Sequence, residues 1–448
     1  MSAGDHHWNS IMSVGTNNQE LGRNNYYETT VQRPQWPRLG TGRHADVAVV
    51  GAGLAGLSCA LELAEQGRSV IVLESGQVCG HASGRNGGQV IAGFACGQGA
   101  LERKLGPDSA REVWDLSLLS IARMRQRIDQ YAIDCHPVWS YLHVADRPHK
   151  ARLLQAEAQH MNTHYGHALK YIEGAALREH LGTRRYVAGL LDPLSGHVNP
   201  LRWGLGLARA AQSMGVEIFE HSPVRHLKRS SDGWILDCEH ASVRAEKVFL
   251  AGNCGLLWES PQLAQPLHAR IMPVGTYIIA TEPLGEDLAR HILPSHAAVC
   301  DNNFVLDYFR LSADSRLLFG GRVSYTTATP MRLQESMRAR MVQIFPQLSR
   351  VAVHHTWGGF VDITRERAPD WGQLEPGLFY AQGFSGHGLA ATTLAGMVIS
   401  QAMMGDAHHL QLFERIEQGA FPGGSAWRLP LLLLGTGYFR LKEFLRMD

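Results

Sequence analysis

The sequence predicts an α/β protein in which a discontinuous βαβ domain is joined to an α+β domain with a mixed or antiparallel sheet. Three observations lead to this fold class. Short apolar runs flank a helix-forming stretch at Asp46–Val50 and Ser69–Glu74. Two further runs of the same kind, Lys247–Gly252 and Leu378–Gly383, return much later in the chain. Between 270 and 325, strand-like segments follow one another without alternating helices, which indicates a second sheet.

The composition is that of a globular protein, with 45% hydrophobic and 19% charged residues. The net charge of +1 gives no electrostatic reason to expect nucleic acid or an anionic membrane as a partner. Histidine and cysteine occur at no zinc-binding spacing, so no metal is expected. Seven cysteines without a C-x-x-C, no signal peptide and no membrane-spanning run predict reduced thiols in a cytoplasmic protein.

The first element is a complete βαβ unit. Asp46–Val50 is a continuous apolar run, as expected of a buried parallel strand. The G-x-G-x-x-G sequence Gly51–Gly56 follows, and then the helix-forming Leu57–Gln66, which Gly67 ends. Ser69–Glu74 is the second strand.

The glycine turn has the residues that a dinucleotide pyrophosphate needs. One glycine permits the tight turn, one lets the backbone meet the phosphates, and one allows close helix packing, while the helix N-terminus faces the negative charge. Glu74 ends the next strand, where a carboxylate accepts from ribose hydroxyls. The alternative is an ordinary glycine turn with a surface glutamate. The predicted contacts here are Gly51, Gly53, Leu54, Ala55, Gly56, Glu74 and Ser75.

The stretch SGRNGGQV, Ser83–Val90, comes shortly after Glu74. Its glycines Gly84, Gly87 and Gly88 would let backbone N–H groups approach a planar, phosphate-bearing ligand. We expect Arg85 and Asn86 to bond a phosphate or the edge of the ring, with a solvated loop as the alternative.

A third glycine-rich turn, GFSGHG at Gly383–Gly388, lies between a buried strand and an apolar helix. A helix N-terminus at this place would stabilise the negative charge of a reduced flavin. His387 either donates to the ring or caps the helix. The chain has a single G-x-G-x-x-G, whereas reductases fed by NAD(P)H usually have two, which favours the substrate as electron donor.

Taken together, VAVVGAGLAGLSCALELAEQG, SGRNGGQV, FLAGN and GLFYAQGFSGHGLAATTLAG resemble the D-amino-acid oxidase and glycine/sarcosine oxidase superfamily of FAD enzymes. YYETT, IMPVGTYIIATEPL, DYFRLSADSRLLFGGR and WGGFVDITRERAPDWG resemble the narrower subgroup of gamma-glutamylputrescine oxidases. The resemblance runs from about Tyr26 to the end of the chain.

This resemblance implies an FAD-binding Rossmann-like domain and oxidation of an amine by hydride transfer to the flavin. The imine would hydrolyse to an aldehyde and ammonia, with O₂ or another acceptor taking the electrons and O₂ giving H₂O₂. The further residues expected to bind FAD are His81, Ala82, Ser83, Arg85, Asn86, Gly87, Gly88, Gln89, Val224, Ala251, Gly252, Gly383, Gly386, His387, Gly388 and Leu389.

The chain departs from the family pattern in three ways. Sarcosine-oxidase relatives have a carboxylate-binding lysine soon after the late turn, but here Leu389 and Ala390 follow. No cysteine follows Cys300, so FAD is not tethered through one there, although His81 leaves another attachment open. No lysine occurs between Lys247 and Lys442, which leaves oxidase and dehydrogenase open.

The missing lysine favours a primary amine with a remote carboxylate, such as gamma-glutamylputrescine or a related polyamine derivative. An α- or N-methyl-amino acid is the alternative substrate, and a flavin-binding subunit without its own catalysis is the alternative class. Tyr308 and Arg310 share one face of a strand and are expected to hold the carboxylate, unless that face is exposed. Trp357 forms either an apolar wall beside the flavin or part of the core.

The order of segments predicts how the domains divide the chain. Residues 411–448 form a C-terminal extension whose amphipathic end is expected to pack on the protein's own surface, with peripheral membrane contact as the alternative. The other expected units are a lead-in at 1–43, the FAD-binding domain at 44–100, 191–255 and 350–410, and the substrate domain at 101–190, mostly helical, and 256–349.

Overall fold

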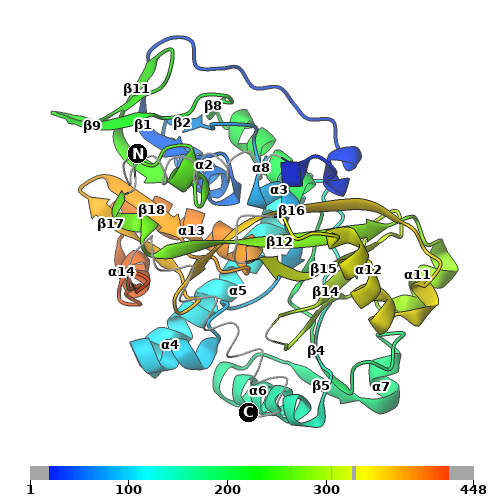
Figure 1. Cartoon of the computed structure of the whole chain (residues 1–448). Coiled ribbons are helices and arrows are strands. Elements are labelled where there is room, and N and C mark those ends of the chain that lie inside the picture. Colours follow the sequence, from blue (N-terminus) through cyan, green and yellow to red (C-terminus); the bar gives the residue numbers. More distant parts are fainter. Residues whose placement is uncertain (1–19, 264, 304, 325–328, 423–448) are drawn as a thin grey trace.

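A computed structural model describes residues 20–422, apart from 264, 304 and 325–328. It contains two eight-stranded sheets, which Figure 1 shows at the upper left (β1, β2, β11, β17, β18) and to the right and below (β4, β5, β12, β14–β16). This arrangement confirms the predicted α/β fold with a Rossmann-like domain and a second, mixed sheet.

The first sheet has the strand order β17-β18-β11-β1-β2-β8, and all of these strands except β17 run parallel. Two short strands, β9 and β10, extend it as a hairpin from β11. The bounds are β1 (Arg43–Val50), β2 (Val70–Leu73), β8 (Glu217–Phe219), β9 (His226–Ser230), β10 (Gly233–Asp237), β11 (Ser242–Leu250), β17 (Asp370–Glu375) and β18 (Leu378–Gln382).

Apolar helices cover this sheet. In α2 nearly every residue is buried, and Gly396 of α13 lies so close to α2 that an added Cβ would lie 2.6 Å from the Cβ of Ser58. The small residues therefore permit the close crossing of the two helices. The helices packed around this sheet are α2 (Leu54–Glu65), α4 (Gln98–Leu105), α5 (Pro107–Gln130), α8 (Pro200–Ser213), α13 (Gly388–Met403) and α14 (His408–Glu414).

The second sheet has the order β16-β12-β15-β14-β13-β4-β6-β5, antiparallel except for the β13–β4 pair. Its bounds are β4 (Tyr141–Ala145), β5 (Lys170–Glu173), β6 (Ala188–Asp192), β12 (Ile271–Thr281), β13 (Ala298–Asp301), β14 (Tyr308–Leu311), β15 (Leu317–Ser324) and β16 (Val353–Thr364). The other helices are α3 (Ala82–Arg85), α6 (Pro148–Tyr165), α7 (Gly174–Arg178), α9 (Gly255–Trp258), α10 (Gln265–His268), α11 (Glu286–Ile292) and α12 (Leu333–Ile344), with 3-10 turns η1 (Tyr26–Thr30) and η2 (Pro346–Leu348). Two short strands, β3 (Gln89–Val90) and β7 (Gly196–His197), pair separately.

The predicted division of the chain differs from the sheets in two places. The segment 101–190 is mostly helical, as predicted, but it also supplies β4, β5 and β6 of the second sheet, while its helix α5 packs on α13 of the other domain. The segment 350–410 begins with β16, which pairs along its length with β12 of the second sheet. Helical patterns and apolar runs do not indicate which segments pair with each other, so the sequence could not predict these two pairings.

In the described part of the chain, no single helix is long and apolar enough to cross a membrane. α13 and α14 meet that test only as a pair bent by 120°, and α13 is almost wholly buried in the protein. Most of the predicted C-terminal extension, 423–448, lies outside the described residues, as does the N-terminal 1–19.

Candidate active site

A pocket opens where parallel strands of the first sheet end. β1, β2 and β11 stop in register, because Val50 pairs with both Leu73 and Leu250. Ligands of open α/β sheets bind at this edge, where the strand order reverses. Predicted residues that line the pocket are Gly51, Gly53, Glu74, Ser75, His81, Ala82, Ser83, Val224, Ala251 and Gly252.

The glycine turn leaves no room for side chains. A Cβ at Gly51 would lie 2.9 Å from the Ala251 carbonyl oxygen, and its φ of 107° is strained for other residues. A Cβ at Gly53 would lie 2.8 Å from the Ser83 Oγ, and one at Gly56 would overlap the Gly51 carbonyl oxygen. Leu54 and Ala55 continue as the buried first turn of α2, and the Leu54 N–H donates to Ser83 Oγ over 3.1 Å.

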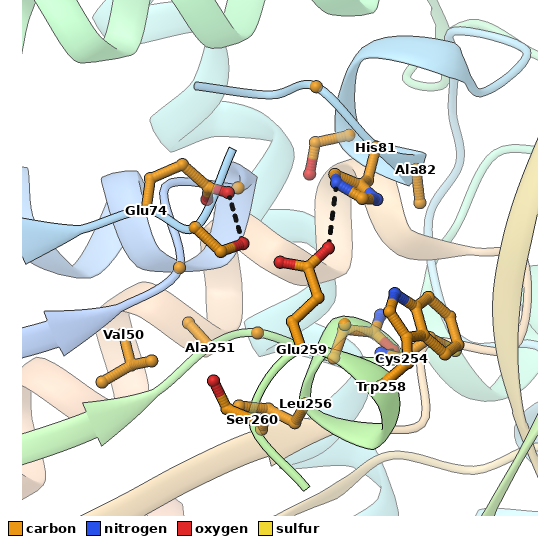
Figure 2. Close-up of a pocket in the computed structure, with 18 of the residues that line it drawn as sticks. Val50, Glu74, His81, Ala82, Ala251, Cys254, Leu256, Trp258, Glu259 and Ser260 are labelled. Atoms are coloured by element: carbon orange, nitrogen blue, oxygen red, sulfur yellow. Dashed lines mark hydrogen bonds and ion pairs between the residues drawn. The ribbon is translucent and has the colours of Figure 1, made fainter. Parts of the chain in front are cut away.

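The carboxylate of Glu74 is 8% exposed and shapes the pocket wall. One oxygen accepts from the Ala52 N–H at 2.8 Å, and the other accepts from the Gly76 N–H at 2.9 Å and the Ser75 hydroxyl at 3.1 Å. Figure 2 shows Glu74 on one side of the pocket, while Glu259 points from the other side to His81, whose Nε2 is 3.5 Å from a Glu259 oxygen.

The segment after the pocket is not a plain loop. Ala82–Arg85 forms the single-turn helix α3, and Asn86 ends it. The Asn86 amide donates to the carbonyls of Ala82 and Ser83, and its oxygen accepts from the Gly88 N–H at 2.8 Å. Asn86 therefore shapes the turn with its own side chain, and its predicted bond to a phosphate or ring edge stays a prediction.

Three buried side chains hold this segment from behind. Tyr27 donates to the Asn86 carbonyl at 2.9 Å, and the Trp357 indole donates to the Arg85 carbonyl at 2.9 Å. Arg310 donates to the carbonyls of Gly87 (2.7 Å) and Leu311 (3.2 Å) and to the Tyr27 hydroxyl (2.9 Å). All three side chains are at most 5% exposed.

These contacts change the role predicted for Arg310 and favour the core alternative for Trp357. The Arg310 guanidinium is 4% exposed and already bonded at all three nitrogens, so it is not presented to a substrate carboxylate. Trp357 is 1% exposed and lies in the core, not as a wall beside open space. Tyr308 and Arg310 do share one face of the strand, as predicted. The Arg310 guanidinium, however, supports the backbone of Gly87 and Gly88, here called the glycine pair.

Tyr308 faces the same glycine pair from the second sheet. Its ring lies between Gly87 and Gly320, and a Cβ at Gly87 would lie 2.7 Å from it. Cys300 pairs with both Tyr308 and His143 on neighbouring strands, so the three side chains point to one face. Tyr308 and His143 are half-buried, so part of each side chain is accessible.

The late turn is held by a buried carboxylate. Asp362 is 2% exposed and accepts from the backbone N–H groups of Gly383 and Phe384, the latter at 3.1 Å. Gly383 and Gly386 have φ values of 82° and 88°, which glycine adopts without strain. Gly388 and Leu389 begin α13, so the helix N-terminus follows this turn as predicted.

His387 precedes α13 without forming a side-chain cap. Burial, followed by the charges of Arg367 and His143, lowers the pKa of His387 to about 4. Burial also lowers the pKa of His143. Both imidazoles are therefore neutral at neutral pH, and the charge of Arg367 lies near His387.

We predict a pH signature for Asp362 in the protein without cofactor. Burial raises the pKa of Asp362 to about 6, so its protonated form stabilises the fold at low pH. That contribution is present below the ordinary value of 3.8 and is lost as the pH rises through about 6. Between about pH 5 and pH 7.5, the Tm of the deflavinated wild type should fall more than that of Asp362→Asn. Differential scanning fluorimetry measures the Tm of both proteins at each pH. Parallel curves of Tm against pH for the wild type and Asp362→Asn would contradict the prediction.

Comparison with known proteins then decides the family. A family model described as FAD dependent oxidoreductase matches residues 46–402. The chain belongs to this family. It is an FAD-dependent oxidoreductase, and its cofactor is FAD, as the motifs predicted.

Two relatives of this oxidoreductase cover nearly the whole chain. A probable oxidoreductase OrdL from Haemophilus influenzae is 37% identical over 95% of this chain and 98% of its own length. The gamma-glutamylputrescine oxidoreductase of Escherichia coli is 35% identical over 89% of this chain and 92% of its own length. Among solved structures, the L-proline dehydrogenase from P. horikoshii has a TM-score of 0.70 at 18% identity, and the match covers 84% of this chain and 100% of that one. This last likeness shows the fold.

The pocket of the oxidoreductase suits FAD. The crowded glycines Gly51, Gly53 and Gly56 leave bare backbone at the N-terminus of α2, where phosphates bind. Residues that the sequence argument missed also line the pocket, namely Cys79, Gly80, Asn253, Cys254, Gly255, Leu256, Trp258, Glu259, Ser260 and Phe360. Most of them follow β11, so the rule that ligands gather at the ends of parallel strands could have found them.

Proposed function

We propose that this FAD-dependent oxidoreductase oxidises the CH–NH₂ group of an amine with a remote carboxylate, gamma-glutamylputrescine or a related polyamine derivative. The observation that supports it most is the 35% identity, over 89% of the chain, to a gamma-glutamylputrescine oxidoreductase. We further propose that the predicted FAD contacts of the strand-end pocket hold the adenosine and pyrophosphate. The turns at 86–88 and 383–388 then face the isoalloxazine.

Leu389 and Ala390 support a substrate whose carboxylate is remote from the reacting carbon. Leu389 and Ala390 are 4% and 3% exposed, so both are packed in the core at the start of α13. An α-carboxylate held near the ring would need a cation there, and these two side chains supply none.

Arg367 is the cation that we propose for the remote carboxylate, in place of Arg310. Its neighbours Arg365 and Lys104 both pair with Glu366, at 3.4 and 2.6 Å. Among the described residues, no hydrogen bond or ion pair joins the Arg367 guanidinium to another side chain. Arg367 is exposed and has a φ of 59°, a strained backbone conformation that is frequent at functional sites.

The charge of Arg367 reaches the space beside the late turn. Burial raises the pKa of the Cys96 thiol to about 11, and Arg367 acts against this increase. Burial also raises the pKa of Cys300, again opposed by Arg367. Since Cys300, Tyr308 and His143 share one face of the second sheet, the charge of Arg367 reaches that face.

The residues around this space prepare an amine for oxidation. FAD, when bound, supplies the acceptor for the two electrons and the hydride. The positive charge of Arg367 attracts the remote carboxylate and so orients the amine at the other end of the substrate. Burial raises the pKa of Tyr308, whose hydroxyl stays protonated and able to donate a hydrogen bond.

Anaerobic mixing with a panel of amines tests the proposed function. We expect gamma-glutamylputrescine to bleach the flavin faster than putrescine, glycine, sarcosine or L-proline. Repeating the reaction in air with peroxide detection separates an oxidase from a dehydrogenase that uses another acceptor. Faster bleaching by an α-amino acid would reject the polyamine assignment, and bleaching by none would reject amine oxidation.

Arg367→Met should weaken the use of the carboxylate-bearing substrate. A hydrogen-bonded charge pair is worth about 1.5–3 kcal/mol, so we expect kcat/KM for gamma-glutamylputrescine to fall roughly ten- to hundredfold. The value for putrescine, which has no carboxylate, should stay within about threefold. Arg365→Met is the matched control in the same turn, because Arg365 pairs with Glu366. Equal losses for both substrates, or in both variants, would contradict the role of Arg367.

We also propose a cytoplasmic location. All seven cysteines lie in the described part of the chain, and no disulfide joins any two of them there, which fits a reducing compartment.

A further inference from the structure

Two histidines and a glutamate from distant parts of the chain meet on one side of the first domain. Glu112 lies on α5, and His408 and His409 lie at the start of α14. The His408 Nε2 is 2.7 Å and the His409 Nε2 is 3.7 Å from the same Glu112 oxygen. In the described part of the chain, these three form a group whose ligand atoms all lie within 4.8 Å of one another.

Their spacing suits a metal ion. Zn²⁺ binds imidazole nitrogen and carboxylate oxygen at about 2.0–2.2 Å, which separates neighbouring ligand atoms in a tetrahedron by about 3.4 Å. The two measured separations lie on either side of that value. A structural or catalytic zinc site with three protein ligands completes its shell with water.

Gln401 provides a second and independent sign. The Nδ1 of His409 lies 2.9 Å from the Gln401 side-chain oxygen, which only accepts, so Nδ1 carries the proton. In the neutral ring the Nε2 lone pair then faces the carboxylate of Glu112. Two electron-rich atoms facing each other are stabilised by a cation between them, and metal-bound histidines carry such an outer hydrogen bond.

We propose that Glu112, His408 and His409 bind one divalent transition-metal ion, of which Zn²⁺ is the best match. The ion would fasten α14 to α5, to which the end of α14 is also joined by a hydrogen bond from Arg415 to the Ser109 hydroxyl at 3.1 Å. The sequence spacing gave no sign of it, because Glu112 and His408 are 296 positions apart. The site lies outside the FAD pocket and the amine-oxidising space, and its proposal is independent of the proposed substrate.

A histidine elsewhere on the surface supplies a matched control. His160 Nε2 lies 2.8 Å from a Glu102 oxygen, nearly the same contact as that of His408 with Glu112. The other partner of this Glu102 oxygen is the Tyr165 hydroxyl, and in the described part of the chain these side chains do not form a three-ligand group like that of Glu112. His160→Ala thus removes a histidine–glutamate pair without removing a three-ligand group.

Isothermal titration of the holoenzyme with ZnCl₂ tests the proposal, on the full chain without a histidine tag and after EDTA treatment and dialysis. We expect one Zn²⁺ per chain and a higher Tm when it is bound. His409→Ala and Glu112→Gln should each weaken binding at least about tenfold, and Gln401→Met roughly ten- to hundredfold.

His160→Ala should bind Zn²⁺ like the wild type. The proposal fails if His409→Ala and Glu112→Gln bind Zn²⁺ as tightly as the wild type, because the ion would then be adventitious. It fails equally if no saturable binding occurs, or if His160→Ala loses as much affinity as His409→Ala. The flavin absorbance of every variant reports whether it has folded and kept its cofactor.

Discussion

Arg310→Met should release FAD and lower stability, while leaving the affinity for the amine almost unchanged. The guanidinium donates three hydrogen bonds, to two carbonyls and to the Tyr27 hydroxyl, and none of these partners is a carboxylate. Hydrogen bonds to a charged group are worth about 1.5–3 kcal/mol each, but removing a buried charge returns part of this. We therefore expect a net loss of about 2–4 kcal/mol in the free energy of unfolding.

The measurements are Tm, the Kd of FAD, and the KM of the amine at saturating FAD. We expect FAD to bind at least about tenfold more weakly, since the 86–88 turn loses its support. Arg310→Lys keeps the charge and one donor, so it should lie between the wild type and Arg310→Met. A large rise in KM with unchanged Tm and FAD affinity would instead place Arg310 on the substrate.

Gly56→Ala should prevent normal FAD binding although it adds a single methyl group. The new Cβ would overlap the Gly51 carbonyl oxygen and lie 3.0 Å from the Val49 Cγ1, so α2 would have to move away from β1. Overpacking of this kind costs about 1–3 kcal/mol. If this whole free-energy cost weakens cofactor binding, the Kd of FAD rises roughly ten- to hundredfold.

Gly40→Ala is the control for this experiment, because nothing lies within 4 Å of a Cβ at Gly40. The ratio of flavin to protein absorbance after gel filtration, followed by titration with FAD, gives the answer. A Gly56→Ala protein that purifies with full flavin would show that the turn does not touch the pyrophosphate.

The sequence predicted the parts of this site that depend on local backbone chemistry. The glycines at 51, 53 and 56 and the carboxylate of Glu74 lie at one pocket because a βαβ unit brings them together within a short stretch. Helical and strand patterns also predicted that one sheet is built from βαβ units and that the other is mixed or antiparallel. The register of β16 with β12 was not predictable, because pairing between segments far apart leaves no local signal.

Side-chain roles were harder to predict than positions. Alternation placed Tyr308 and Arg310 on one face, and the structure has them both against the glycine pair. An arginine on an inner face can hold a ligand or hold the backbone, and only the positions of Gly87 and Tyr27 decide between these. Asn86 is similar, since its amide has enough local backbone partners to be fully occupied.

The supports of the 86–88 turn have a consequence for biosynthesis. Tyr27 and Arg310 are 283 positions apart, and Arg85 and Trp357 are 272 apart. During translation, the early glycine turn and its first strands emerge long before these partners exist. We expect the ring end of the cofactor site to take shape only after the ribosome has released most of the chain, so that nascent chains cut short before β16 remain colourless.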